Sequence, residues 1–169
     1  GRTYGTLELS SLAAGGSKSY LSNGITTANI RGDFSIRTGV NYSLDFTGDL
    51  IVLGSLYING NFNLAAAPNN NIIKIRQHLH CAGNITESST GIPIIELNGT
   101  VNQDIFIPGN MLNSVILRMN NPSGATLLSA VSLPYKLELL NGKLTTTSFF
   151  LLTLQPNCSI QADSTKNNC

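Results

Sequence analysis

The amino-acid sequence predicts an all-β fold, namely a right-handed parallel β-helix or a closely related β-solenoid with imperfect coils of about 20 residues. Three observations support this prediction. No long segment carries apolar residues at helical spacing, short runs alternate between apolar and polar residues, and the same Asn-Gly punctuation returns after several runs. An antiparallel β-sandwich is the structural alternative, because short strands at regular spacing also suit it.

The alternating runs define the expected strands in chain order. Side chains along a strand point to opposite faces in turn, so each run can bury one side and expose the other. The runs occupy residues 6–9, 34–36, 56–58, 73–75, 94–97, 115–117 and 137–139. They are short and numerous, as expected of a coiled chain.

The Asn-Gly corners favour a solenoid over hairpins. Gly60, Gly99 and Gly142 each follow an Asn at the end of a run and stand 39 and 43 residues apart, so half of each interval is near 20. One Asn-Gly pair can serve an ordinary hairpin. Three in equivalent positions are better explained as corners of successive coils, where both residues tolerate positive φ and stacked Asn side chains can bond to one another.

The chain length of 169 residues suits one domain with a real core. We expect residues 1–157 to form a single solenoid domain, in which residues 1–20 are either an N-terminal cap or the first coil. Residues 158–169 are polar and are expected to form a C-terminal tail.

Composition bears on the expected partners. Charged residues make up 11% of the chain, and the net charge of +1 comes from dispersed residues without a Lys/Arg cluster. Such a surface does not suit phosphate backbones, so no nucleic acid partner is expected. The sequence also contains no apolar run of membrane-helix length, so no membrane span is expected.

Residues 113–157, NSVILRMNNPSGATLLSAVSLPYKLELLNGKLTTTSFFLLTLQPN, resemble repeated segments of large secreted surface proteins of the Bacteroidota, which are commonly exported by the type IX secretion route. The upstream stretches GDLIVLGSLYINGNF and IIELNGTVNQDI resemble preceding coils of the same proteins. The resemblance rests on Leu137, Leu139, Gly142, Leu144, Thr146, Leu152, Thr153 and Leu154. It implies an extracellular, structural or adhesive β-helical region that carries no catalytic residue.

The tripeptide Arg31-Gly32-Asp33 is a candidate adhesion motif, since integrins read Arg-Gly-Asp on loops. Gly-Asp returns at Gly48-Asp49, however, with Thr47 in place of Arg. This return favours a structural corner of the coil over an adhesive site.

The stretch QHLHC is the candidate metal site. Alternation places His78 and His80 on one side of a strand and Cys81 on the other. A structural zinc site needs four ligands, and the chain contains no further His. We therefore predict neither a metal nor a cofactor.

Carboxylates matter because many parallel β-helices act on polysaccharides, and glycoside hydrolysis needs a facing pair of acids. The nine acidic residues are scattered singly along the sequence: Glu8, Asp33, Asp45, Asp49, Glu87, Glu96, Asp104, Glu138 and Asp163. This scatter favours a non-catalytic spacer. A carbohydrate-active β-helix, either a lyase or a hydrolase, is the alternative.

Two cysteines near the end of the sequence could close a short loop in an oxidising compartment. They are Cys158 and Cys169, and their pairing would leave Cys81 unpaired. Three unpaired thiols are the alternative, because spacing alone does not establish connectivity.

An apolar strand close to the carboxyl end is the candidate interface. Its large side chains belong to Phe149, Phe150, Leu151, Leu152 and Leu154, and only polar sequence follows. The end strands of a solenoid lack neighbours, and burying such a side chain contributes about 1.5 to 3 kcal/mol. We expect further coils, other copies, as in a filament, or another surface protein to cover this strand. The polar flanks could offer weak contacts to glycans.

Overall fold

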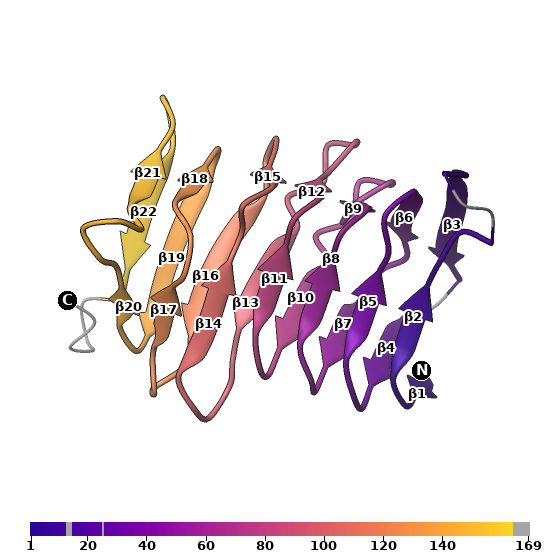
Figure 1. The fold of residues 1–169 in the computed structure, drawn as a ribbon, viewed down its shortest axis with the longest axis horizontal. Helices are drawn as coiled ribbons and strands as arrows, with labels where there is room; N and C mark the ends of the chain where they lie inside the picture. Colours follow the sequence, from indigo (N-terminus) through magenta and orange to yellow (C-terminus); the bar gives the residue numbers. More distant parts are fainter. Residues whose placement is uncertain (13–14, 25, 164–169) are drawn as a thin grey trace.

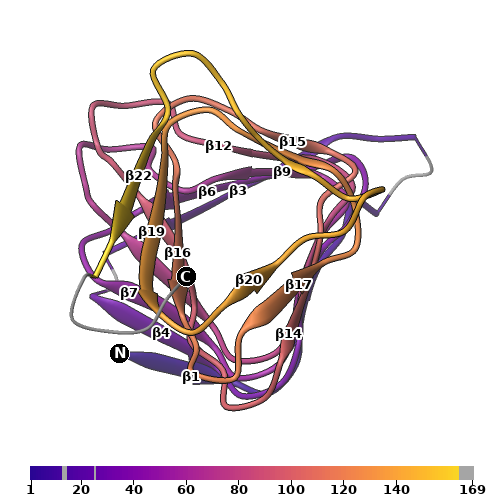
Figure 2. The same cartoon turned by 90° about the vertical axis from the view of Figure 1, so that its left-hand side faces the viewer.

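The computed structural model describes residues 1–12, 15–24 and 26–163, which form a parallel β-solenoid of about 7 turns (Figure 1). Seen from the carboxyl-terminal end (Figure 2), successive coils superpose as a rounded triangle, and the chain runs counterclockwise as it advances toward the viewer. This is the right-handed sense, so the predicted fold is confirmed. None of the described residues forms a helix long and apolar enough to cross a membrane.

Three sides of the solenoid carry the strands, and all pairs are parallel. Sheet A contains, in order, β1 (Arg2–Tyr4), β4 (Thr27–Ile30), β7 (Asp49–Val52), β10 (Ile72–Ile75), β13 (Ile94–Leu97), β16 (Ile116–Asn120), β19 (Lys136–Asn141) and β22 (Ser159–Ala162). Sheet B contains β2 (Leu7–Leu9), β5 (Phe34–Ile36), β8 (Leu56–Ile58), β11 (Leu79–Cys81), β14 (Gln103–Phe106), β17 (Ala125–Leu127) and β20 (Leu144–Thr145).

The third side is divided between two sheets. Sheet C contains β3 (Lys18–Asn23), β6 (Val40–Asp45), β9 (Asn61–Asn63), β12 (Asn84–Thr86) and β15 (Asn110–Met111). Sheet D contains β18 (Val131–Leu133) and β21 (Leu152–Leu154), which follow sheet C along the same side (Figure 1).

In-register stacking builds the core as columns of apolar side chains. In sheet A, Leu50 pairs with Ile73, Ile73 with Ile95, and Ile95 with Leu117. All four side chains are buried. Coils repeat about 22 residues apart, so every inward position lies directly above its counterpart one coil earlier.

The three Asn-Gly glycines lie at corners, but these corners are not equivalent as predicted: Gly60 lies between β8 and β9, whereas Gly99 and Gly142 follow β13 and β19. Positive φ explains only one of the three. Gly142 has φ 85°, whereas Gly60 and Gly99 have no positive φ. At Gly60 and Gly99, a Cβ would meet carbonyl oxygens of the preceding coil, those of Val40 and Arg76 among them. Close approach of stacked backbones is therefore the more general reason for glycine here.

Strands at both ends of the described chain belong to coils. The strands β1, β2 and β3 pair with β4, β5 and β6, so these three strands form the first described coil. At the other end, β22 pairs with β19 and aligns Ile160 with Leu137. Sheet A thus continues into the segment expected to be a tail, because Ile160 and Ala162 alternate with polar residues as in the earlier coils.

Candidate functional site

An ion-pair cluster on the outer face of sheet A is the main gathering of charge. Glu96 pairs in register with Arg118, and Arg118 with Glu138. The Arg118 guanidinium lies 3.1 Å from Glu96 through Nη1 and 2.7 Å from Glu138 through Nε. Lys136 Nζ lies 2.8 Å from the other Glu138 oxygen. Two carboxylates and two cations compensate one another.

The cluster is well covered although it faces outward. The Glu96 and Glu138 side chains are 8% and 9% exposed. Burial would raise the pKa of Glu138, but the hydrogen bonds from Lys136 and Arg118 outweigh it and hold that pKa below its ordinary value. Glu138 is therefore stabilised as a carboxylate and is not prepared to donate a proton.

This pair of glutamates corrects the expectation that the acidic residues lie singly. Stacking brings Glu96 and Glu138 to the same guanidinium, although they are 42 residues apart in the sequence. The sequence held one signal of this contact. Arg118 stands 22 residues after Glu96 and 20 residues before Glu138, close to one coil in each direction. A general acid for glycoside hydrolysis requires a raised pKa, and Glu138 has a lowered one. The arrangement resembles a structural clamp between coils.

The predicted sides of the QHLHC strand are confirmed. Cys81 points into the core and is fully buried, and burial raises the pKa of its thiol to about 12. His80 lies outward and stacks on Tyr57, with ring centroids 5.0 Å apart. Burial and the neighbouring His78 lower the pKa of His80.

His78 is engaged with the next coil. Its Nδ1 accepts the backbone N–H of Asp104 at 3.0 Å and lies 3.4 Å from an Asp104 carboxylate oxygen. Within the described part of the chain, no group of three or more His, Cys, Asp and Glu is placed to hold a metal ion. The two histidines thus contact neighbouring coils.

The Arg31-Gly32-Asp33 tripeptide lies at a coil corner. Asp33 Oδ1 accepts the backbone N–H of Ser55 at 2.8 Å, in the next coil. A Cβ at Gly32 would collide with the Thr6 hydroxyl of the preceding coil. Gly32 and Asp33 are therefore both engaged in coil stacking, as expected of a structural corner, and Arg31 is exposed.

An asparagine ladder follows sheet C. Each side-chain amide donates to the amide oxygen one coil earlier: Asn61 to Asn41 at 2.6 Å, Asn84 to Asn61 at 2.6 Å, and Asn110 to Asn84 at 2.9 Å. The expected stacking of Asn side chains thus occurs. The stacked Asn follows the glycine, as in Gly60-Asn61 and Gly83-Asn84, whereas the Asn-Gly corners had suggested the Asn before it. The ladder presents an uncharged amide surface along one side of the rod.

The predicted interface segment is largely exposed, but only Leu152–Leu154 of it form a strand, β21, and residues 149–151 precede that strand. Phe149 is 85% exposed, and Phe150, Leu151 and Leu154 are exposed as well, while Leu152 packs partly against the core. Among the described strands, β21 pairs only with β18, so its other edge is open. The Thr147 hydroxyl accepts the backbone N–H groups of Phe149 and Phe150 and shapes the turn that presents these rings.

Cys158, one of the two cysteines considered for a disulfide, packs half-buried against the core as a free thiol. Burial raises its pKa. Cys169 lies outside the described residues, so the pairing stays a prediction.

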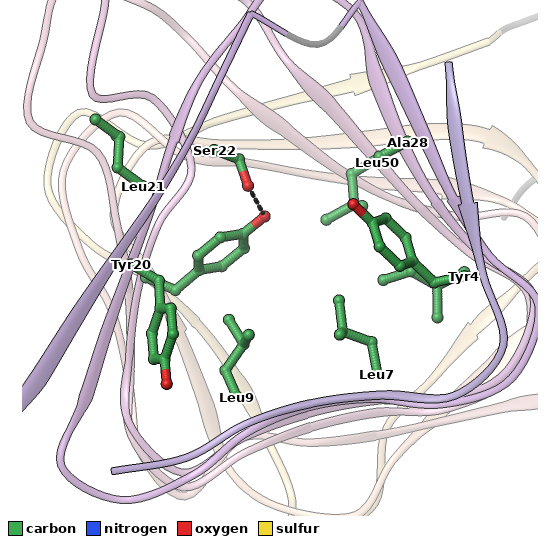
Figure 3. Close-up of a pocket in the computed structure, with 10 residues that line it drawn as sticks. Tyr4, Leu7, Leu9, Tyr20, Leu21, Ser22, Ala28 and Leu50 are labelled. Atoms are coloured by element: carbon green, nitrogen blue, oxygen red, sulfur yellow. Dashed lines mark hydrogen bonds between the residues drawn. The ribbon is translucent and has the colours of Figure 1, made fainter. Parts of the chain in front are cut away.

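Sequence reasoning missed an apolar cavity at the amino-terminal end (Figure 3). Its volume is about 180 Å³, and the first coil supplies Tyr4, Leu7, Leu9 and Tyr20 to its wall. The second coil adds Tyr42, whose hydroxyl lies 2.8 Å from the Ser22 hydroxyl. Among the described residues, no further side chains cover this part of the core.

No protein-family model, curated protein or solved structure matches this chain. The class of this protein is therefore defined by the architecture of the chain itself. The chain is a parallel β-solenoid whose principal charge cluster is internally compensated and whose described ends are apolar.

Proposed function

We propose that this solenoid is a non-catalytic structural, adhesive or spacer segment of a bacterial cell-surface or secreted protein. The single observation that carries the proposal is the continuity of its ladders. Sheet A runs through eight strands from β1 to β22 without an interruption. Every interior coil is bonded to the coil before and after it, which makes a stiff quasi-one-dimensional rod.

The dimensions suit a spacer. About 7 turns at the strand spacing of about 4.8 Å give a rod about 34 Å long. The bacterial surface location rests on the resemblance of residues 113–157 to repeated segments of secreted Bacteroidota proteins. The low charged fraction of 11% and the amide ladder agree with a surface kept soluble by neutral polar groups.

A polysaccharide assay tests the non-catalytic part of the proposal. The purified chain and its Glu138→Gln variant are incubated with a panel of neutral and acidic polysaccharides. We expect neither new reducing ends nor unsaturated products from either protein. Depolymerisation by the wild type that disappears in Glu138→Gln contradicts the proposal. Antibody labelling of intact producing cells tests the surface location.

A carbohydrate-active solenoid is the second candidate, and one observation favours it. Glu96 and Glu138 share Arg118, so an acid pair and a cation do occur together on one face. It ranks second because both carboxylates are covered and already ion-paired, which leaves neither free to contact a sugar.

A further inference from the structure

Three Asn-Gly pairs lie at corners of the rod, and this dipeptide is chemically labile. They are Asn59-Gly60, Asn98-Gly99 and Asn141-Gly142. In spontaneous deamidation the glycine backbone nitrogen attacks the Asn side-chain carbonyl carbon, a C–N bond forms, and ammonia leaves. Water then opens the cyclic imide to aspartate or isoaspartate, so the net reaction consumes one water and releases one ammonia. Glycine favours the attack, because it carries no side chain next to the attacking nitrogen.

The attacking nitrogen of the Asn98-Gly99 pair is bonded inside the core. The Gly99 N–H donates to Gln103 Oε1 at 2.8 Å, and Gln103 is fully buried. Gln103 is itself fixed, because its Nε2 donates to two backbone carbonyls of the preceding coil and its Oε1 also accepts Asn121 Nδ2 at 2.9 Å. The Asn98 Oδ1 atom is buried as well. Attack at this pair therefore requires the loss of a buried hydrogen-bond network.

The other two glycine nitrogens are less restrained. The Gly60 N–H shares the Ile36 carbonyl oxygen with the Asn59 N–H, at 3.2 Å against 2.8 Å, and Asn59 is exposed. The Gly142 N–H donates no hydrogen bond to any described residue. Asn141 ends β19, where the ladder with β16 shifts its register. Such an irregular ladder opens locally more readily than a regular one.

We propose that Asn59 and Asn141 are modification sites that deamidate in the folded protein, whereas Gln103 protects Asn98. This inference is independent of the structural role proposed above. Each conversion adds one carboxylate, so the formal net charge falls from +1 to −1 when both sites have reacted. The isoaspartate product also adds one carbon to the backbone path at a corner. The rod therefore gains negative charge at two corners with age.

Peptide mapping by mass spectrometry tests the proposal within one molecule, because the three pairs serve as controls for one another. The folded protein is incubated at mildly alkaline pH in water labelled with heavy oxygen, which marks every site that is hydrolysed during the incubation. Asn59 and Asn141 should convert at least about ten-fold faster than Asn98, the factor that one protective hydrogen bond can supply. In guanidinium chloride the three pairs should react at similar rates, because the unfolded chain no longer distinguishes them.

Gln103→Leu removes the acceptor of the Gly99 N–H. The Asn98 rate should rise about ten-fold, while an unchanged Asn59 rate shows that the fold is intact. Gln77→Leu is the matched control, because Gln77 is exposed and contacts Gln103 only through its backbone carbonyl, so all three rates should stay as in the wild type.

Two results overturn the inference. One is a folded wild type in which Asn98 converts as fast as Asn59 or Asn141. The other is a folded wild type that retains all three amides over a period in which the denatured chain loses them. Both comparisons use the unsubstituted protein, so they decide the question even where Gln103→Leu unfolds. The polysaccharide assay reads catalysis and peptide mapping reads deamidation, so the two proposals fail separately.

Discussion

The Arg118 guanidinium binds carboxylates from the coil before it and the coil after it. Its position in sheet A gives it this role, since Glu96, Arg118 and Glu138 occupy one outward column. The same side chain on an isolated strand would have water as its main partner. Stacking therefore turns ordinary surface residues into a partly buried network whose members depend on one another.

Arg118→Met tests this dependence. The change leaves two covered carboxylates without their shared cation, and we expect a loss of about 2 kcal/mol in the free energy of unfolding, below the value for a fully buried pair because Arg118 is partly exposed. Urea denaturation measures it. Arg37→Met is the control, because the Arg37–Glu8 pair is 55% and 47% exposed and its loss should not change stability measurably. Equal effects of the two substitutions would contradict the account.

The lowered pKa of Glu138 predicts an acid-sensitive contribution to stability. A carboxyl with a folded-state pKa below its unfolded value of about 4.5 binds protons more readily in the unfolded chain. Its contribution is therefore fully present above pH 4.5 and is lost as the pH falls through the folded-state pKa. Glu138→Gln should flatten the pH dependence of the unfolding midpoint below 4.5 and leave its slope above 6 unchanged. An unchanged acid slope would contradict this assignment.

The thiols should differ in reactivity. Cys81 is fully buried with a pKa raised to about 12, whereas Cys158 is only half-buried. Because the thiolate is the reactive species, alkylation of the folded protein at pH 8 should label Cys158 first and Cys81 only after unfolding. Peptide mapping by mass spectrometry reads both sites. Rapid labelling of native Cys81 would contradict the position of β11 in the core.

Sequence reasoning placed residues on the correct faces but did not find their neighbours in adjacent coils. The alternation in QHLHC was sufficient to place His80 and Cys81 on opposite faces of the strand. The Glu96–Arg118–Glu138 column was missed because its intervals of 22 and 20 residues differ. Corners of unequal length change the sequence interval between residues that stack in register, so a fixed period does not align the outward residues.

At the scale of elements, corners limit the fold more strictly than strands do. The strands tolerate varied outward residues, whereas several glycines lie against the backbone of the preceding coil. Gly142 combines both constraints, with φ 85° and a Cβ position that would collide with the Asn121 carbonyl oxygen. A side chain there must displace one coil from the next.

Gly142→Ala should therefore lower the free energy of unfolding by about 1 to 3 kcal/mol, the cost of a side chain in an incompatible backbone conformation. The matched control is Gly5→Ala, since Gly5 has no positive φ and no atom within 4 Å of the added Cβ. Thermal unfolding of both variants measures the difference. A Gly142→Ala protein as stable as Gly5→Ala would show that the corner is not close-packed.

The seven alternating runs fall on strands of sheets A and B, about half of those sheets' strands, and none falls on a strand of sheet C. β9 (Asn61–Asn63) and β12 (Asn84–Thr86) each carry one inward apolar residue between polar neighbours. Such a segment matches a turn as well as a strand when it is read alone. The Asn ladder supplies its stabilisation through contacts between coils, which local sequence does not reveal.

At the scale of the whole molecule, alternation and repeated punctuation led to the correct solenoid fold, although Gly60 lies at a different corner from Gly99 and Gly142. The role of the rod was harder to predict. A β-solenoid can serve as an enzyme or as a scaffold, and the choice depends on outward residues that the fold leaves free. The amino-terminal cavity was hidden because Tyr4, Leu7 and Tyr20 form its wall only after coiling.

The central claim is that this chain is a stiff rod of stacked coils with a structural role. Small-angle X-ray scattering tests the rod most directly, because it measures the length and the cross-section of the particle separately. We predict a folded particle with a height of about 34 Å, as about 7 turns require. The scattering profile of a flexible, extended chain would contradict the account.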